Sequence, residues 1–151
     1  MVNSHIAHDC VVGNNVIMTN NAVIGGHVHV GDGAILGGNS AVHQFCHIGR
    51  KAMIGGMSGV ERDVIPFGIV TGDRGRLRGL NVIGLKRSGV DEHTVKSVTR
   101  AFMYIFKGKE DTFDIRVEKA REKFADNPMV MEQLDFIAES LHGRRKIMTA
   151  E

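Results

Sequence analysis

The feature that most constrains this chain is a six-residue repeat in its first half. An aliphatic residue recurs at every sixth position: Ile6, Val12, Met18, Ile24, Val30, Leu36, Val42, Ile48, Ile54 and Val60. The residue four positions further on is always small or β-branched, and glycine often follows the aliphatic residue directly. Helices need a period of about 3.5 to 3.6 residues, so this spacing excludes them. It is typical of a parallel β-helix in which three hexapeptides complete one coil.

A glycine-rich β-sandwich is the alternative fold, but its turns are irregularly spaced. In a β-helix, residues eighteen apart should lie on successive coils, about 4.8 Å from each other. Two of the resulting columns carry polar side chains, one with His8, Gly26 and Gln44 and the other with Asp9, His27 and Phe45. The repeat therefore predicts which residues meet in space.

The chain divides into two unlike modules near residue 72. Residues 1–72, which hold most of the glycines and histidines, are predicted as the β-helix, and Pro66 interrupts its repeat. Residues 73–90 are predicted as a basic connecting loop, and residues 91–151 as an α-helical C-terminal domain that covers one end of the β-helix. Helices are expected over 91–107, over 112–125 and from Asn127, where an N-cap asparagine precedes Pro128.

Charge, apolar content and cysteine number argue against nucleic-acid-binding, membrane-spanning and secreted proteins. The net charge of +2 is too small to indicate nucleic-acid binding, and no aromatic residues lie among the basic ones. No apolar run approaches the roughly 20 residues of a membrane helix, and no secretion signal is present. Cys10 and Cys46 would lie two coils apart, about 10 Å, which is too far for a disulfide. These observations predict a cytoplasmic protein with reduced thiols.

The first coil begins a few residues after Met1, with no capping segment ahead of it. Solenoids need their ends covered. We therefore expect this β-helix to be part of a longer one, or to pack against something that covers its open end.

Five motifs together resemble the UDP-N-acetylglucosamine O-acyltransferase family, over almost the whole chain. They are HIAHDC at 5–10, GGHV at 25–28, AVHQFCHIG at 41–49, IGGMSGVERDV at 54–64 and GLNVIGLKRSG at 79–89. The resemblance implies a left-handed β-helix, a homotrimer with active sites between subunits, and transfer of an (R)-3-hydroxyacyl group from acyl carrier protein to the 3-hydroxyl of UDP-N-acetylglucosamine. This is the first step of lipid A biosynthesis. No metal or cofactor is implied, because the donor carries its own phosphopantetheine.

The resemblance also implies roles for individual residues. His8 matches the catalytic general base, a task suited to a side chain with a pKa near 6.5. Asp9 would orient the imidazole, and the N–H of Gly26 would contact the oxyanion. The implied substrate-binding residues are His5, His27, His43, Gln44, Gly56, Arg74, Asn81 and Arg87. Gly56 would leave room for the acyl chain, and the basic residues near Arg74 and Arg87 would meet the anionic donor.

Two other functions stay open. The family carries further coils ahead of HIAHDC that help to hold the nucleotide sugar, so this chain could be an inactive trimeric scaffold that binds acyl carrier protein or ligand. The other is a zinc-dependent enzyme like the carbonic anhydrases of the same fold, which use three histidines drawn from two subunits. A lone histidine is most often a solvated surface group, and Arg76 and Arg78 are equally explained as parts of a solvated basic loop.

Overall fold

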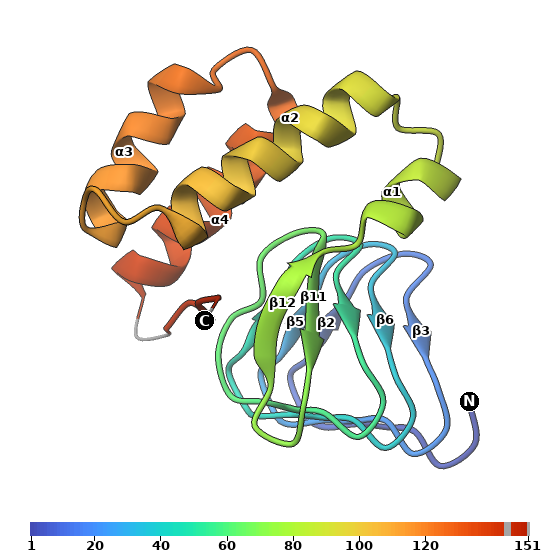
Figure 1. Ribbon diagram of the computed structural model, residues 1–151. Coiled ribbons are helices and arrows are strands. Elements are labelled where there is room, and N and C mark those ends of the chain that lie inside the picture. Colours follow the sequence, from blue (N-terminus) through green and yellow to red (C-terminus); the bar gives the residue numbers. More distant parts are fainter. Residues whose placement is uncertain (144–145, 151) are drawn as a thin grey trace.

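A computed structural model describes residues 1–143 and 146–150. The first half is a stack of very short parallel strands wound into coils (Figure 1). These strands are β1 (His5–Ile6), β2 (Val11–Val12), β3 (Ile17–Met18), β4 (Val23–Ile24), β5 (His29–Val30), β6 (Ile35–Leu36), β7 (Ala41–Val42), β8 (His47–Ile48), β9 (Met53–Ile54) and β10 (Gly59–Val60). Across the described residues they form three faces, ordered β1-β4-β7-β10, β2-β5-β8 and β3-β6-β9.

The register confirms the predicted coil of eighteen residues. His5 pairs with Val23, and Ile6 with Ile24, one coil later. The repeating aliphatic side chains point inward and form the core: Ile24 is 1% exposed, and Leu36 and Ile54 are fully buried. The small residues pack beside them. At the first coil the same inward position is open, and Ile6 is 50% exposed.

Each coil turns at three corners, and the residue at each corner has a left-handed backbone conformation. Positive φ angles recur every six residues at Asn3, Asp9, Asn15, Asn21, His27, Gly33, Asn39, Phe45, Lys51 and Met57. Asparagine, aspartate and glycine tolerate this conformation best. A phenylalanine at such a corner is therefore notable.

The last coil is two residues shorter than the others. Ile48 bridges to Val64, and Ile54 pairs with Val70, so the offset falls from eighteen residues to sixteen. This shortening lies just ahead of Pro66, where the repeat was expected to break. The strand β11 (Gly68–Thr71) then completes the coil and turns back into β12 (Arg76–Leu80), its antiparallel partner.

The segment 73–90 is not the loop expected from its sequence. It contains strand β12 and the helix α1 (Val82–Arg87), which is capped by Asn81. The glycines and arginines that suggest a loop belong instead to a hairpin that seals the last coil. Leu77 and Leu85 are buried at 2% and 1% exposure, so this segment contributes to the core.

The C-terminal half is helical, as expected. It comprises α2 (Glu92–Phe102), which continues into the π-helical η1 (Met103–Lys107), then α3 (Phe113–Lys123) and α4 (Pro128–His142). The helices gather at the end of the β-helix that holds the last coils (Figure 1). None of the helices in the described part of the chain is long and apolar enough to cross a membrane.

Two polar contacts fix α4 on the β-helix. The guanidinium of Arg50 donates to both carboxylate oxygens of Glu132, at 3.0 and 2.8 Å. The buried Gln133 donates from Nε2 to the carbonyl oxygen of Pro66 at 2.9 Å. The two modules therefore meet at the shortened coil.

Candidate active site

His8 and Asp9 form a hydrogen-bonded pair at a corner between β1 and β2. Nδ1 of His8 lies 2.9 Å from Oδ2 of Asp9. An ionised carboxylate can only accept, so the imidazole proton lies on Nδ1 and the lone pair of Nε2 is free. Both side chains point outward, with exposures of 70% and 67%. This is the arrangement expected of an orienting carboxylate and a general base.

The charge of Asp9 is stabilised by its histidine neighbours. The hydrogen bond from His8 is the main reason why the pKa of the Asp9 carboxyl lies below its ordinary value of 3.8, and the nearby His27 lowers that pKa further. Nε2 of His27 lies 3.9 Å from Oδ2 of Asp9. Asp9 is therefore ionised at neutral pH and available to stabilise a protonated His8.

Gly26 lies directly against the His8 ring, one coil along. A Cβ added at Gly26 would stand 2.6 Å from both Cε1 and Nε2 of His8. Any other residue would push the imidazole away, so glycine is required by this close approach. Among the described residues, the N–H of Gly26 donates to no acceptor. It is a free donor in the residue that lies against the His8 ring.

The column predicted from the eighteen-residue repeat is present above Asp9. The His8 and His27 rings meet edge to face, with centroids 5.1 Å apart. The His27 ring in turn stacks on Phe45, with centroids 4.9 Å apart and planes 7° apart. Asp9, His27 and Phe45 all have positive φ angles. The same corner of three successive coils thus carries Asp9, His27 and Phe45 in one column.

A hollow of about 740 Å³ continues from this column towards the last coil. Its lining includes three of the predicted binding residues, His27, His43 and Gln44. Nδ1 of His43 lies 3.1 Å from the carbonyl oxygen of Gln44. The hollow brings these three residues together. Neither His8 nor Asp9 lines it, and His27 is the residue that contacts both the hollow and the His8–Asp9 pair.

The remaining predicted residues lie elsewhere. His5 is exposed on β1, in the same coil as His8. Gly56 stands at a different corner, between β9 and β10, where an added Cβ would lie 3.3 Å from the carbonyl oxygen of Gly38. No contact among the described residues joins either of them to His8, so their substrate roles stay predictions.

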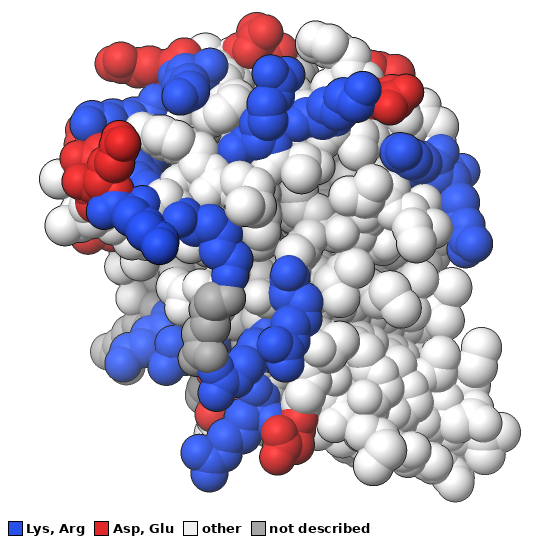
Figure 2. Space-filling model, viewed as in Figure 1, with Lys and Arg blue, Asp and Glu red and all other residues white. Residues whose placement is uncertain are grey.

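The predicted donor-site residues belong to the hairpin and α1. Arg74 lines a small hollow with Arg62 and Arg76. The side chain of Asn81 accepts from the N–H of Gly84 at 3.0 Å, so it serves as the cap of α1, and Arg87 is exposed in the last turn of that helix. On the face shown in Figure 2, Lys and Arg gather over the hairpin and the helices, whereas the early coils are almost uncharged.

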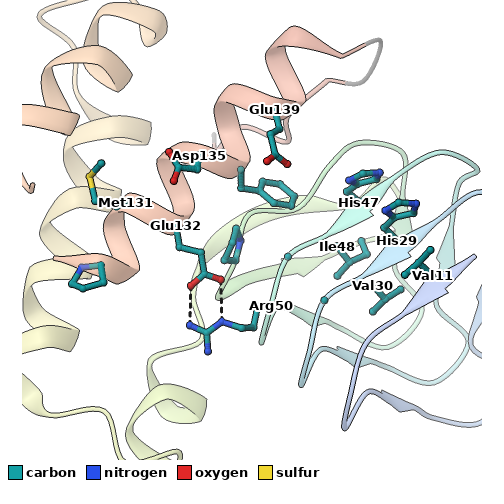
Figure 3. A pocket seen from close by; sticks show the side chains of 15 residues that line it. Val11, His29, Val30, His47, Ile48, Arg50, Met131, Glu132, Asp135 and Glu139 are labelled. Atoms are coloured by element: carbon teal, nitrogen blue, oxygen red, sulfur yellow. Dashed lines mark hydrogen bonds and ion pairs between the residues drawn. The ribbon is translucent and has the colours of Figure 1, made fainter.

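A second hollow, of about 590 Å³, separates the β2-β5-β8 face from α4 (Figure 3). Its floor carries the stacked rings of His29 and His47, 4.3 Å apart. The opposite wall carries Glu132, Asp135 and Glu139 from α4. None of the predicted site residues lines it.

One group in the described part of the chain has the ligand types and spacing for a metal ion, namely His8, Asp9 and His27. Their potential ligand atoms lie within 4.8 Å of one another. The group holds two histidines and a carboxylate, all exposed, whereas the expected zinc site has three histidines. Nδ1 of His8 is hydrogen-bonded to Oδ2 of Asp9 at 2.9 Å, and Nε2 of His27 lies 3.9 Å from the same oxygen.

Sequence reasoning left some lining residues without a role. Phe45 was placed in the column by the repeat, but nothing in the repeat showed its ring lying flat on His27. Lys146 and Asp63 line the hollow because the C-terminal segment returns to the β-helix, where Asp63 pairs with Ile147. A periodic pattern carries no signal for such a long-range return.

Comparison with known proteins shows which family this chain resembles in sequence. A family model described as "Udp N-acetylglucosamine O-acyltransferase; Domain 2" matches residues 63–148. Proteins named "Acyl-[acyl-carrier-protein]--UDP-N-acetylglucosamine O-acyltransferase" are similar to this chain. The protein of that name from Caulobacter vibrioides is 56% identical over 137 residues, which cover 91% of this chain and 52% of the relative. The one from Sinorhizobium fredii is 50% identical over 137 residues, with 89% and 50% covered.

Solved structures are similar in fold as well. The UDP-N-acetylglucosamine acyltransferase of Arabidopsis superposes with a TM-score of 0.93 at 39% identity, over 97% of this chain and 52% of that one. The enzyme of that name from Campylobacter jejuni gives a TM-score of 0.88 at 34% identity, over 98% and 56%. The fold is thus the left-handed parallel β-helix with a helical C-terminal domain that the resemblance implied. The chain spans about half the length of the curated relatives it matches.

Proposed function

Because this chain belongs to the UDP-N-acetylglucosamine O-acyltransferase family, we propose that it transfers an (R)-3-hydroxyacyl group from acyl carrier protein to the 3-hydroxyl of UDP-N-acetylglucosamine. This would be the first step of lipid A biosynthesis, carried out in the cytoplasm without a metal or added cofactor. The observation that carries the proposal is the His8–Asp9 pair, with its free Nε2 held against Gly26.

The geometry supports general-base catalysis. Nε2 of His8 takes the proton from the sugar hydroxyl as the oxygen attacks the thioester carbonyl carbon, and Asp9 stabilises the imidazolium that forms. The free N–H of Gly26 is positioned to donate to the oxyanion of the tetrahedral intermediate. When that intermediate collapses, the C–S bond breaks and the proton passes from His8 to the departing thiolate. No covalent enzyme intermediate is required.

A homotrimer belongs to this proposal. The His8 and Asp9 side chains are about two-thirds exposed, so a single chain supplies one wall of the site. A neighbouring β-helix would supply the other wall and exclude water. His5, Gly56, Arg74, Asn81 and Arg87 are then proposed to contact the acceptor, the acyl chain and the donor across that cleft.

Replacing His8 with alanine tests the general base. We expect His8→Ala to lower turnover about 10²- to 10⁴-fold, the usual contribution of a general base, while the mass of the assembly in solution is unchanged. His93→Ala is the matched control, because His93 is an exposed histidine in the first turn of α2. Near-normal turnover of the His8 variant would remove His8 from the mechanism. The assay is run on this chain and on a version joined to the upstream coils of a relative.

An inactive trimeric scaffold that binds acyl carrier protein or ligand is the second candidate. The same pair of assays separates the two: a scaffold binds UDP-N-acetylglucosamine or acyl carrier protein but turns over only when the upstream coils are restored. Metal analysis of the purified protein addresses the zinc enzyme. Stoichiometric zinc that survives dialysis would favour the His8, Asp9 and His27 group as a metal site.

A further inference from the structure

Phe45 is an unusual residue for the position it occupies. It stands at a corner with a φ of +68°, a backbone conformation that large side chains rarely adopt. Its side chain is also 52% exposed, although burial of an aromatic ring is a main source of stability. Neither the core nor the turn therefore accounts for a phenylalanine here. Among the described residues, its aromatic contact is the stack on His27.

The stack is geometrically tight. The ring centroids lie 4.9 Å apart, close to the spacing of neighbouring strands, and the ring planes differ by only 7°. Backbone hydrogen bonds hold the two corners in step: the N–H of His27 donates to the carbonyl of His8, and the N–H of Phe45 donates to the carbonyl of Gly26, both at 3.0 Å. These hydrogen bonds fix the backbone from which the His27 and Phe45 side chains extend.

His27 has contacts on both of its sides. Phe45 covers one face of the imidazole, and the edge-to-face contact with His8 bounds the other side at 5.1 Å. In this orientation Nε2 of His27 points to the Asp9 carboxylate, 3.9 Å away. The His27 side chain is 44% exposed, so without the stack it would be free to rotate towards solvent.

We propose that Phe45 is a positioning residue that holds the His27 imidazole in the orientation facing Asp9. Phe45 acts through His27 and needs no contact with the reacting atoms. This inference builds on the acyltransferase function proposed above, because the orientation of His27 matters there for acceptor binding and for the charge of Asp9. The stack itself can be tested whether or not the chain turns over.

The first experiment measures the orientation of His27 by NMR, through the three-bond couplings that report its χ1 angle. We expect a single rotamer in the unaltered protein and in Phe45→Tyr, which keeps the aromatic face. In Phe45→Leu we expect averaged couplings, because the leucine fills similar space without stacking. Lys51→Leu is the matched control: it places the same leucine at another left-handed corner, with a φ of +53°, away from His27. A single rotamer in Phe45→Leu would overturn the proposal.

The second experiment asks whether Phe45 acts through His27. In the acyl-transfer assay, Phe45→Leu should lower kcat/KM for the sugar nucleotide about threefold to tenfold, in keeping with the strength of aromatic stacking. Phe45→Tyr should retain most of the activity. In a His27→Ala background, Phe45→Leu should cause no further loss. An equal loss with and without His27 would show that Phe45 acts by another route and overturn the proposal.

If no form of the protein transfers acyl groups, the proposed function fails, while the coupling measurement still decides on the stack. If transfer is normal but His27 keeps a single rotamer in Phe45→Leu, only the positioning role of Phe45 is contradicted. The two ideas therefore have separate outcomes.

Discussion

At the scale of single residues, the His8–Asp9 pair is formed by sequence neighbours that one corner of the backbone brings together. His8 and Asp9 are adjacent in sequence, and a left-handed φ of +57° at Asp9 lets both side chains point outward. In an ordinary strand, adjacent side chains would point to opposite faces. The corner is thus what turns two sequence neighbours into a hydrogen-bonded pair.

This pair predicts an acid titration for Asp9. We expect the Asp9 carboxyl to titrate below 3.8, mainly because of its hydrogen bond with His8. Since the pKa is depressed in the folded protein, the charge-assisted bond is intact above the ordinary pKa and is lost as the pH falls through the lowered value. Carbon-13 NMR of the carboxyl measures this directly. In His8→Ala the midpoint should rise towards the ordinary value, and an unchanged midpoint would mean that His8 does not stabilise the charge.

Much of this site could be predicted from the sequence, because the eighteen-residue repeat converts positions into neighbours. It placed Gly26 over His8, and His27 and Phe45 over Asp9, and the structure confirms both columns. The flat stacking of Phe45 could not be predicted, because it depends on side-chain rotamers that a spacing does not encode. The contribution of Lys146 to the hollow also escaped prediction.

At the scale of elements, local signals succeeded where their physical cause is local. Asn127 caps α4 as its sequence predicted: Oδ1 accepts from the N–H groups of Met129 and Val130, at 3.0 and 3.3 Å. Strand β12 was missed because its pairing with β11 is a tertiary contact within a glycine- and arginine-rich segment. The two-residue shortening of the last coil could not be predicted either. In the six-residue repeat Val64 fits the small or β-branched position, whereas in the structure it pairs with the aliphatic Ile48.

The cap of α4 supports a stability prediction. Replacing Asn127 with alanine should lower the free energy of unfolding by about 1–2 kcal/mol, because it leaves two N–H groups without their acceptor. The cap is only 7% exposed, so water cannot easily take its place. Asn127→Asp keeps an acceptor and should lose much less. Urea unfolding of both variants measures the difference, and equal losses would show that the side-chain oxygen is not what stabilises the helix.

At the scale of the whole molecule, the burial of each coil follows from the neighbours that it has in this chain. The last coil is closed by the β11–β12 hairpin and by α4, which Arg50 and Gln133 fix in place. The first coil has no such cover among the described residues. The burial of the inward aliphatic column therefore rises along the axis, from Ile6, which is half exposed, to Ile24, which is 1% exposed. The corner of His8 and Asp9 follows strand β1, in the first of the described coils.

This gradient predicts that the same substitution has unequal costs one coil apart. Ile6 and Ile24 are direct partners in the sheet. Ile24→Ala should lower the free energy of unfolding by about 2–5 kcal/mol, as expected for truncation of a buried isoleucine. Ile6→Ala should cost under about 1.5 kcal/mol, because half of that side chain already contacts solvent.

Urea unfolding of the two variants in this chain gives the comparison, with the mass in solution checked for each. Equal losses would mean that Ile6 is buried in solution, by a second copy or another cover at the first coil. If the losses differ as expected, joining one further coil ahead of Ile6 should bring its cost into the range of Ile24, because the added coil supplies neighbours for Ile6. Such a rise would also place the His8–Asp9 corner inside a continuous solenoid, with structural support on both sides.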